Sequence, residues 1–171
     1  MDSRSIDDLH PQLAYAFGLS CGRWAALYPG APTPFLTQTF RSDARQNALF
    51  EQPRDGRDND GDGRIDEADE FVTNARAGQS PHNYRPALAL DVGFRRLDGS
   101  LDWSEKWFNY FAQLMLELPN ITWGGTFKQL RDRPHFELTD WESRVPQPIP
   151  ATRTTPPRRP AAPPHSPPKP R

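Results

Sequence analysis

The chain of 171 residues has a single cysteine, Cys21, so an intrachain disulfide is excluded and the fold cannot depend on oxidation. Because Cys21 lies in an apolar segment, we expect it to be a small buried core residue. Long apolar runs are also missing, and none approaches the roughly 20 residues that a membrane-spanning helix needs. We therefore expect no stable membrane insertion.

The first eight residues lack the basic start and apolar core of a secretory signal peptide. We therefore expect a chain that is made as a soluble cytoplasmic protein and needs another agent to release it if it acts outside the cell. The length fits one domain followed by a tail. We also expect a monomer that does not bind nucleic acid.

Acidic residues are missing from the last 29 residues, which hold six Lys/Arg and 11 of the 20 prolines. The first 142 residues hold all 22 acidic residues against 15 Lys/Arg, a balance of −7. A basic, proline-rich tail behind an acidic domain is typical of a solvated arm, disordered or partly polyproline II. The composition predicts a folded domain over 1–144 and a disordered tail over 145–171.

Hydrophobic periodicity predicts helices and short strands in one domain. Apolar residues recur at helical spacing over 5–28, as one helix or a helix pair, and over about 103–118, and a capped short helix is expected over 44–51. Strand character marks four further segments, 34–40, 88–94, 121–123 and 134–139. Strand alternation turns Asp91 away from the apolar residues of its strand, and it turns His135 and Glu137 away from those of the last strand.

The acidic stretch 55–70 matches the calcium loop of an EF-hand, with eight acidic residues in sixteen and a turn glycine, Gly63, at position 6. The predicted ligands are Asp58, Asp60, Asp62, the Arg64 carbonyl, Asp66 and Asp69. So many carboxylates repel one another unless a cation binds, although a solvated acidic loop is the alternative. Because Pro53 blocks an entering helix, we expect a single calcium-stapled loop and no paired calcium sensor.

Three residues from separate elements could form a zinc site. His82 ends a loop, while Asp91 and His135 lie on strands that could hold them at fixed geometry. Two histidines and one carboxylate are suitable zinc ligands, and three protein ligands leave a fourth position open, as catalytic zinc requires. Asp132 lies three residues before His135, where it could act as a general base, and Glu137 is the rival for that role.

Several segments, in this order along the chain, resemble those of the zinc D,D-peptidase family, which includes D-alanyl-D-alanine carboxypeptidases and the L-alanyl-D-glutamate endopeptidases of phage endolysins. The resemblance covers about residues 10–140. The segments are Thr39-Phe40-Arg41-Ser42-Asp43, Val72-Thr73-Asn74-Ala75-Arg76, Ser80-Pro81-His82-Asn83-Tyr84, Ala89-Leu90-Asp91, Trp123-Gly124-Gly125 and Asp132-Arg133-Pro134-His135-Phe136-Glu137.

This resemblance implies an α+β fold shared with the Hedgehog signalling domain, with a small antiparallel sheet and packed helices. It implies zinc on His82, Asp91 and His135, and Asp132 as the catalytic base. Arg41 would polarise the scissile carbonyl or stabilise the oxyanion. Substrate contacts are expected from Gln46, Ser80, Tyr84 and Trp123.

The sequence departs from the family pattern in two places. His82 and Asp91 are nine residues apart, where seven is the common family spacing, so the extra residues around Arg85-Pro86 must bulge from the loop. The acidic stretch 55–70 also occupies a connection that is usually short in the family.

The leading hypothesis is a calcium-stabilised peptidoglycan endopeptidase of phage origin. It would cut the L-alanyl-D-glutamate bond of the stem peptide after release from the host cytoplasm. A second hypothesis is a D-alanyl-D-alanine carboxypeptidase or dipeptidase with the same zinc, base and arginine. A third is a calcium-stabilised cell-wall-binding module whose zinc site is only structural.

Overall fold

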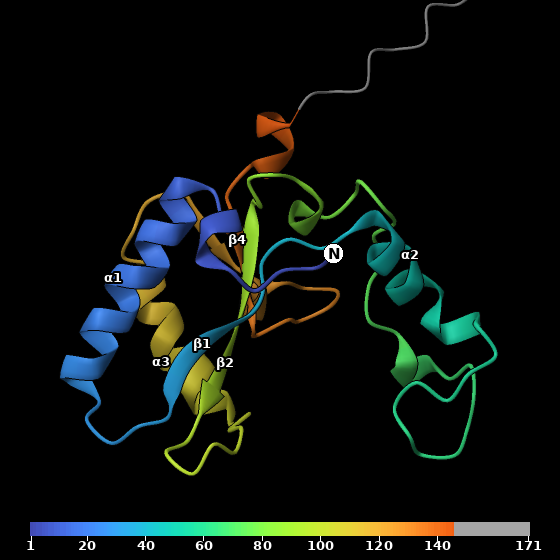
Figure 1. Ribbon diagram of the computed structural model, residues 1–171, viewed down its shortest axis with the longest axis horizontal. Helices are drawn as coiled ribbons and strands as arrows, with labels where there is room; N and C mark the ends of the chain where they lie inside the picture. The colour runs from blue at the N-terminus through green and yellow to red at the C-terminus, as the bar shows by residue number, and fades with distance from the viewer. Residues whose placement is uncertain (146–171) are drawn as a thin grey trace, which may run out of the picture.

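The computed structural model describes residues 1–145, so the tail predicted over 145–171 lies, except for Val145, outside the described residues. Three α-helices and four strands form the described domain (Figure 1). The helices are α1 (Pro11–Leu27), α2 (Asp43–Glu51) and α3 (Glu105–Met115), and the strands are β1 (Thr33–Gln38), β2 (Ala89–Arg95), β3 (Ile121–Trp123) and β4 (His135–Leu138).

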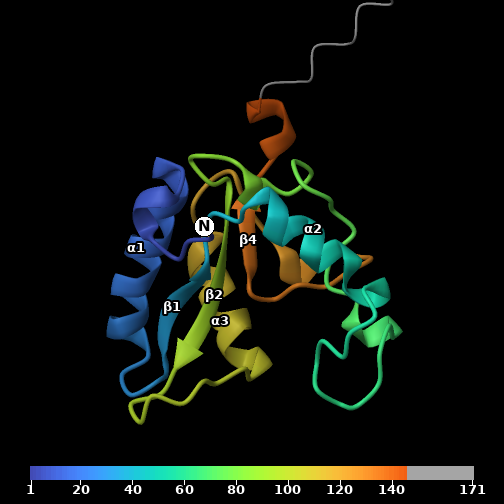
Figure 2. The same ribbon diagram turned by 45° about the vertical axis from the view of Figure 1, so that its right-hand side comes forward.

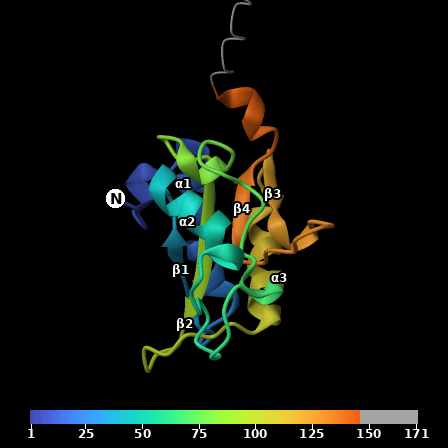
Figure 3. The ribbon, with the colours of Figure 1, turned by 90° about the vertical axis from the view of Figure 1, so that its right-hand side faces the viewer.

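The strands form one antiparallel sheet in the order β1-β2-β4-β3. Helices α1 and α3 cover one face of this sheet, while α2 and the acidic stretch lie on the opposite side (Figures 1 and 3). The predicted α+β class with a small antiparallel sheet is therefore confirmed. The sheet keeps one face for the core and leaves the other for polar side chains, as antiparallel sheets commonly do.

The core lies between the sheet and the pair α1 and α3. In β2, the side chains of Leu90, Val92 and Phe94 are fully or almost fully buried, as the alternation predicts. The Phe94 ring makes edge contacts with Phe108 and Phe111, with ring centroids 5.0 and 6.0 Å apart. Buried aromatic rings contribute large apolar areas to this core, together with its aliphatic side chains.

The first predicted helix is divided by Pro11. Residues Ile6–Asp8 form a short 3-10 helix, and α1 begins at Pro11 with the His10 side chain accepting a hydrogen bond from the Gln12 amide. Proline suits the first position of a helix because its missing N–H would have no intrahelical partner there.

Cys21, on α1, is half-buried against the core instead of fully buried, and its burial raises the thiol pKa to about 11.

Helix α2 holds the segment that follows the acidic stretch. The Gln46 side chain donates to the Ala75 carbonyl at 2.7 Å, and the Asn47 side chain accepts from the Ala77 amide at 2.9 Å. The Arg76 guanidinium lies 4.6 Å from the centre of the Phe50 ring. Residues 75–77 are thus fixed on α2, beside the polar face of the sheet (Figure 2).

Across residues 1–145, no helix is long and apolar enough to cross a membrane.

Replacing Phe94 by alanine should lower the free energy of unfolding by about 3–5 kcal/mol, because a fully buried ring is lost and leaves a cavity. Urea denaturation measures the change. The matched control is Tyr15→Ala, which removes a 64% exposed ring from α1 and should change stability little. Equal effects of the two substitutions would contradict the assignment of Phe94 to the core.

Candidate metal centre and active site

Backbone pairing places two of the three predicted zinc ligands side by side. Asp91 on β2 is the direct antiparallel partner of His135, the first residue of β4. The third ligand, His82, lies in a 3-10 turn (Pro81–Asn83) whose first turn is capped by the Ser80 side chain. Two strands and one capped turn therefore converge at a single point on the polar face of the sheet.

The three side chains present ligand atoms at metal-binding distances from one another. His82 Nε2 lies 3.3 Å from Asp91 Oδ1 and 3.3 Å from His135 Nδ1, and the last two atoms are 3.1 Å apart. Zinc–ligand bonds of 2.0–2.1 Å in a tetrahedron separate the ligand atoms by about 3.3 Å. The triangle of ligand atoms therefore fits three corners of a zinc tetrahedron.

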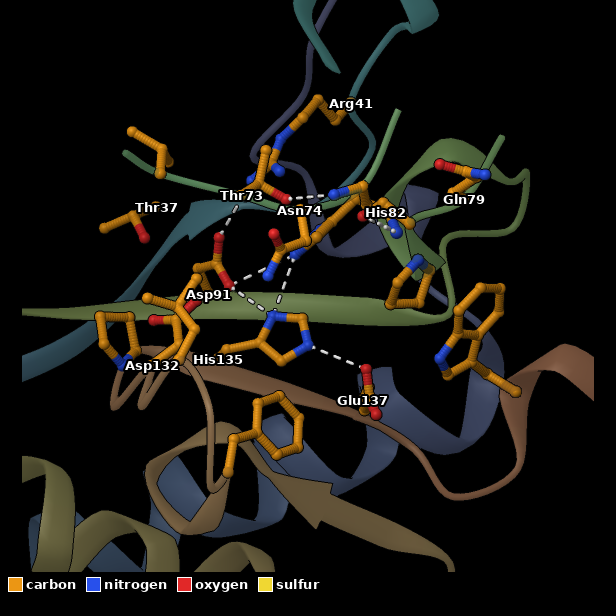
Figure 4. A pocket seen from close by; sticks show the side chains of 18 of the residues that line it. Thr37, Arg41, Thr73, Asn74, Gln79, His82, Asp91, Asp132, His135 and Glu137 are labelled. Carbon is orange, nitrogen blue, oxygen red and sulfur yellow. Dashed lines mark hydrogen bonds and ion pairs between the residues drawn. The ribbon is translucent and has the colours of Figure 1, made fainter. Parts of the chain in front are cut away.

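Hydrogen bonds on the far side of each imidazole fix which nitrogen faces the metal position. His82 Nδ1 donates to the Thr39 carbonyl at 2.7 Å, because a carbonyl oxygen can only accept. His135 Nε2 lies 3.0 Å from the Glu137 carboxylate (Figure 4). In the neutral form of each imidazole, the other nitrogen is then the unprotonated one and faces Asp91, and such supporting bonds orient metal ligands in proteins.

The electrostatics of this point favour a cation. Burial would raise the pKa of Asp91, but the neighbouring His82 and His135 hold it well below its usual range. Burial would lower the pKa of His135, but hydrogen bonds to Asp91 and Glu137 raise it to about 10. The groups thus attract a proton to the position where their lone pairs meet, and a divalent metal would replace that proton.

Arg41 lies on the other side of Asp91 from His135 (Figure 4). Its Nη2 is 3.5 Å from the second carboxylate oxygen of Asp91, and its Nη1 donates to the Gln46 side chain at 3.2 Å. Within the described residues, the buried Nε–H has no hydrogen-bond partner. The Arg41 side chain also lines the cleft beside the metal position.

Asp132 is held next to the triad by a close backbone contact. Its amide donates to the Gly124 carbonyl at 3.0 Å, and a Cβ on Gly124 would lie only 2.5 Å from the Asp132 carbonyl oxygen. The absence of a side chain at Gly124 therefore allows the two backbone segments to lie in close contact. Burial, followed by the charge of Asp91, raises the pKa of the Asp132 carboxyl.

These groups line one cleft of about 480 Å³, a volume typical of a site for a small ligand or a short peptide. The sequence predicts only some of the residues that line this cleft. Residues that it did not assign include Thr37, Thr73, Asn74, Gln79, Trp103, Phe127 and Trp141. Thr73 and Asn74 belong to a segment that carries the family resemblance, which is the one sequence signal that could have identified them.

The predicted substrate-binding residues divide into two groups. Ser80 lines the cleft, whereas Gln46, Tyr84 and Trp123 are not among its lining residues. Gln46 is buried beneath Arg41, the Tyr84 hydroxyl donates to the Gly78 carbonyl at 2.6 Å, and the Trp123 indole N–H donates to the Arg133 carbonyl at 2.8 Å. In the structure these three side chains support the walls, and their contact with substrate stays a prediction.

The unusual spacing between His82 and Asp91 is absorbed by a loop directed toward the N-terminus. The Ala87 amide donates to the Asp8 carbonyl at 2.7 Å, and the Arg85 side chain pairs with the Asp8 carboxylate. The Leu88 amide donates to the Pro81 carbonyl at 2.9 Å, which closes the loop at its base. The extra residues therefore leave Asp91 within 3.3 Å of His82.

Three of the predicted calcium ligands lie together in the acidic stretch. The carboxylates of Asp58, Asp60 and Asp62 lie within 4.8 Å of one another, and Gly63 has a φ of +94°. Asp66 and Asp69 are outside this group, and the Asp66 carboxylate accepts from the Gly56 amide at 2.8 Å. The neighbouring Glu70 is buried and accepts from the Asn59 amide at 2.6 Å.

Comparison with known proteins matches residues 73–138 to the family model described as D-alanyl-D-alanine carboxypeptidase. The chain is 33% identical over 111 residues to the peptidoglycan L-alanyl-D-glutamate endopeptidase CwlK of Bacillus subtilis (strain 168). That alignment covers 60% of this chain and 59% of CwlK, so the chain spans less than two thirds of this relative.

A solved structure shows the same fold. The L-Ala D-Glu endopeptidase ChiX of Serratia marcescens superposes with a TM-score of 0.53 over 85% of this chain and 93% of that chain, at 20% sequence identity. The segment matched by the family model contains His82, Asp91, Asp132 and His135, which the fold brings to one cleft. The matched segment, the fold and the site geometry all support a member of the zinc D,D-peptidase family.

Proposed function

We propose that this protein is a zinc-dependent endopeptidase that hydrolyses the L-alanyl-D-glutamate bond of the peptidoglycan stem peptide. The observation that carries the proposal is the triad of His82, Asp91 and His135, spaced for tetrahedral zinc beside a buried carboxylate in an open cleft. The choice of bond rests on the similarity to CwlK, an L-alanyl-D-glutamate endopeptidase by name.

Zinc would be held by His82 Nε2, Asp91 and His135 Nδ1, which leaves one tetrahedral position for substrate or water. Held there, the ion supplies Lewis-acid catalysis at the scissile carbonyl. The protein contributes the fixed ligand geometry, since the Thr39 carbonyl and the Glu137 carboxylate hold the two imidazoles in place.

Asp132 is the proposed general base. Its carboxyl lines the cleft, and burial raises its pKa from the ordinary value toward the range useful for proton transfer. It would take the proton of the attacking water and later deliver it to the leaving amine. A dication bound at the triad would itself lower this pKa, against the effects of burial and of Asp91.

Arg41 is the proposed electrostatic stabiliser of the carbonyl oxygen as negative charge develops there. Gln46 orients it from behind, through the 3.2 Å contact between the guanidinium and the amide oxygen. Glu137, the rival for the base, is occupied by His135 at 3.0 Å, so we assign it to the support of that imidazole.

A D-alanyl-D-alanine carboxypeptidase is the second candidate, favoured by the description of the matched family model. Both activities would use the same zinc ligands, base and arginine. They differ in which bond of the stem peptide the cleft places beside the metal, so only the products separate them.

Two further proposals concern the setting of the enzyme. The motifs resemble the endolysin branch most closely, which supports a phage-encoded protein that reaches the cell wall after release from the host cytoplasm. The grouped carboxylates of Asp58, Asp60 and Asp62 support calcium binding in the acidic stretch, with a structural role.

Incubation of the zinc-loaded protein with a defined stem peptide, followed by mass spectrometry, tests the function. We expect a new C-terminal L-alanine and a new N-terminal D-glutamate. Release of terminal D-alanine alone would establish the carboxypeptidase instead.

Asp132→Asn should lower kcat on the same peptide by about 100- to 10,000-fold, because the proton acceptor is lost. Zinc content and melting temperature should be retained, which separates catalysis from folding. The matched control is Asp7→Asn, an exposed carboxylate outside the cleft, which should keep wild-type kcat. Full activity of Asp132→Asn would rule out this residue as the base.

Glu137→Gln should weaken zinc binding by about 10- to 100-fold, because the His135 imidazole loses its charged partner while an amide oxygen can still accept its N–H. Competition with a chromophoric chelator measures the affinity. Glu117→Gln removes an exposed carboxylate that pairs with Arg23 and is the control, with zinc affinity unchanged. If Glu137→Gln bound zinc with the affinity of the wild type, the assignment of Glu137 to the support of the metal site would be wrong.

Calcium should raise the free energy of unfolding of the zinc-loaded protein, by about 2.7 kcal/mol at a concentration 100-fold above Kd. Thermal unfolding with and without calcium measures the effect. Asp60→Ala should abolish it, because one of the three grouped carboxylates is lost. Asp98→Ala, in a hairpin outside that group, should retain it. A melting temperature indifferent to calcium in the wild type would refute the calcium site.

A further inference from the structure

A large aromatic side chain stands exposed on the rim of the cleft that contains the metal triad. Trp103 lines this cleft together with Thr37, and 53% of its surface is accessible to solvent. The proposed hydrolysis assigns no role to Trp103, because the zinc ligands, the base and Arg41 account for the chemistry. Exposed tryptophan beside a cleft is a frequent anchor for binding partners.

Trp103 is held in position before any ligand arrives. Its ring stacks on Phe108 at a centroid distance of 6.0 Å and an interplanar angle of 16°. The preceding residue, Asp102, donates its amide to the Phe94 carbonyl at 2.8 Å and accepts from the Trp107 indole at 2.9 Å. A ring fixed in this way loses little conformational entropy on binding.

Gly93 leaves the sheet beside Asp91 without a side chain at one position. Gly93 follows Asp91 on the same face of β2, and a Cβ there would lie 2.8 Å from the Thr37 side chain and 3.0 Å from the Phe35 ring. The glycine therefore lets the β1 side chains lie flat against β2. The polar face continues from the triad along β1 and β2, with Thr37 among the lining residues of the cleft.

The chemistry of the proposed substrate indicates which part would pack on Trp103. Stem-peptide residues carry small or charged side chains, which offer little surface to a flat ring. The N-acetylated sugars of the glycan strand instead present a face of C–H groups, which an aromatic face attracts through its negative quadrupole. The sugar joins the stem peptide through a lactyl group at L-alanine, one residue from the proposed scissile bond, so its subsite must adjoin the metal cleft.

We infer that Trp103 is the aromatic platform of a glycan subsite that binds the muramoyl sugar next to the scissile peptide. This inference rests on the proposed function for the identity of the polymer. Binding energy from the sugar would then serve to position the peptide over the metal, as remote parts of substrates commonly do. The subsite makes the enzyme prefer stem peptides that are still attached to glycan.

The test compares two substrates that differ only in the sugar. One is a disaccharide-peptide from peptidoglycan, and the other is the same peptide with an N-acetyl group on L-alanine, which keeps the acylated nitrogen. We expect Trp103→Leu to lower kcat/KM for the disaccharide-peptide by about tenfold, the value of one aromatic contact, and to leave the acetylated peptide unchanged.

Two further variants make the comparison specific. Trp103→Phe keeps a flat ring and should restore most of the preference for the sugar-bearing substrate. Tyr15→Ala removes an exposed ring from α1 on the other face of the sheet and should leave both substrates unaffected. Equal losses on both substrates in Trp103→Leu, or no loss on either, would overturn the glycan subsite.

A failure of the proposed function would be recognised separately. If the wild type cleaved neither substrate, the endopeptidase proposal would fail, and the subsite would be decided by calorimetric titration with N-acetylglucosamine tetramer. Binding by the wild type that is lost in Trp103→Leu would support the subsite. Absent binding, or equal binding by both proteins, would overturn it.

Discussion

The antiparallel pairing of β2 with β4 is the constraint on which the rest of the site depends. It sets Asp91 opposite His135, and the two-residue period of a strand sends both side chains to the polar face while Leu90 and Phe136 enter the core. A shift of β4 by one residue in this register would bury the His135 imidazole and expose the Phe136 ring. The same contacts that build the hydrophobic core therefore fix the proposed metal ligands.

The remaining groups around this pair are held by hydrogen bonds in which at least one partner is a main-chain group. The Thr39 carbonyl orients His82, the Gly124 carbonyl holds the Asp132 amide, and the Arg41 amide donates to the His82 carbonyl at 2.9 Å. Because backbone groups move less than side chains, such bonds preorganise a site at small entropic cost. A buried triad with few mobile partners suits electrostatic catalysis, which depends on dipoles that are already in place.

The acidic stretch is connected at both ends to elements that support the cleft. Helix α2 precedes it and binds the segment 75–77 that follows it, through Gln46 and Asn47. Gln46 also contacts Arg41, so one buried side chain links the arginine of the cleft to the cleft wall at Ala75. The acidic stretch thus lies outside the proposed catalytic groups. It connects α2, which positions Arg41, to the cleft wall at Ala75.

Local sequence determined which residues could do chemistry here and on which elements they lie. Alternation identified the polar faces of β2 and β4, and the helical periodicity located α1 and α3 within a few residues. The acidic spacing likewise marked Asp58, Asp60 and Asp62 as a group.

Tertiary structure alone decided the rest. It assigned Glu137 to His135, moved Gln46, Tyr84 and Trp123 behind the cleft walls, and brought Trp103 to the rim. The reason is physical: periodicity reports the face on which a side chain lies, whereas its partner depends on the packing of segments distant in the chain.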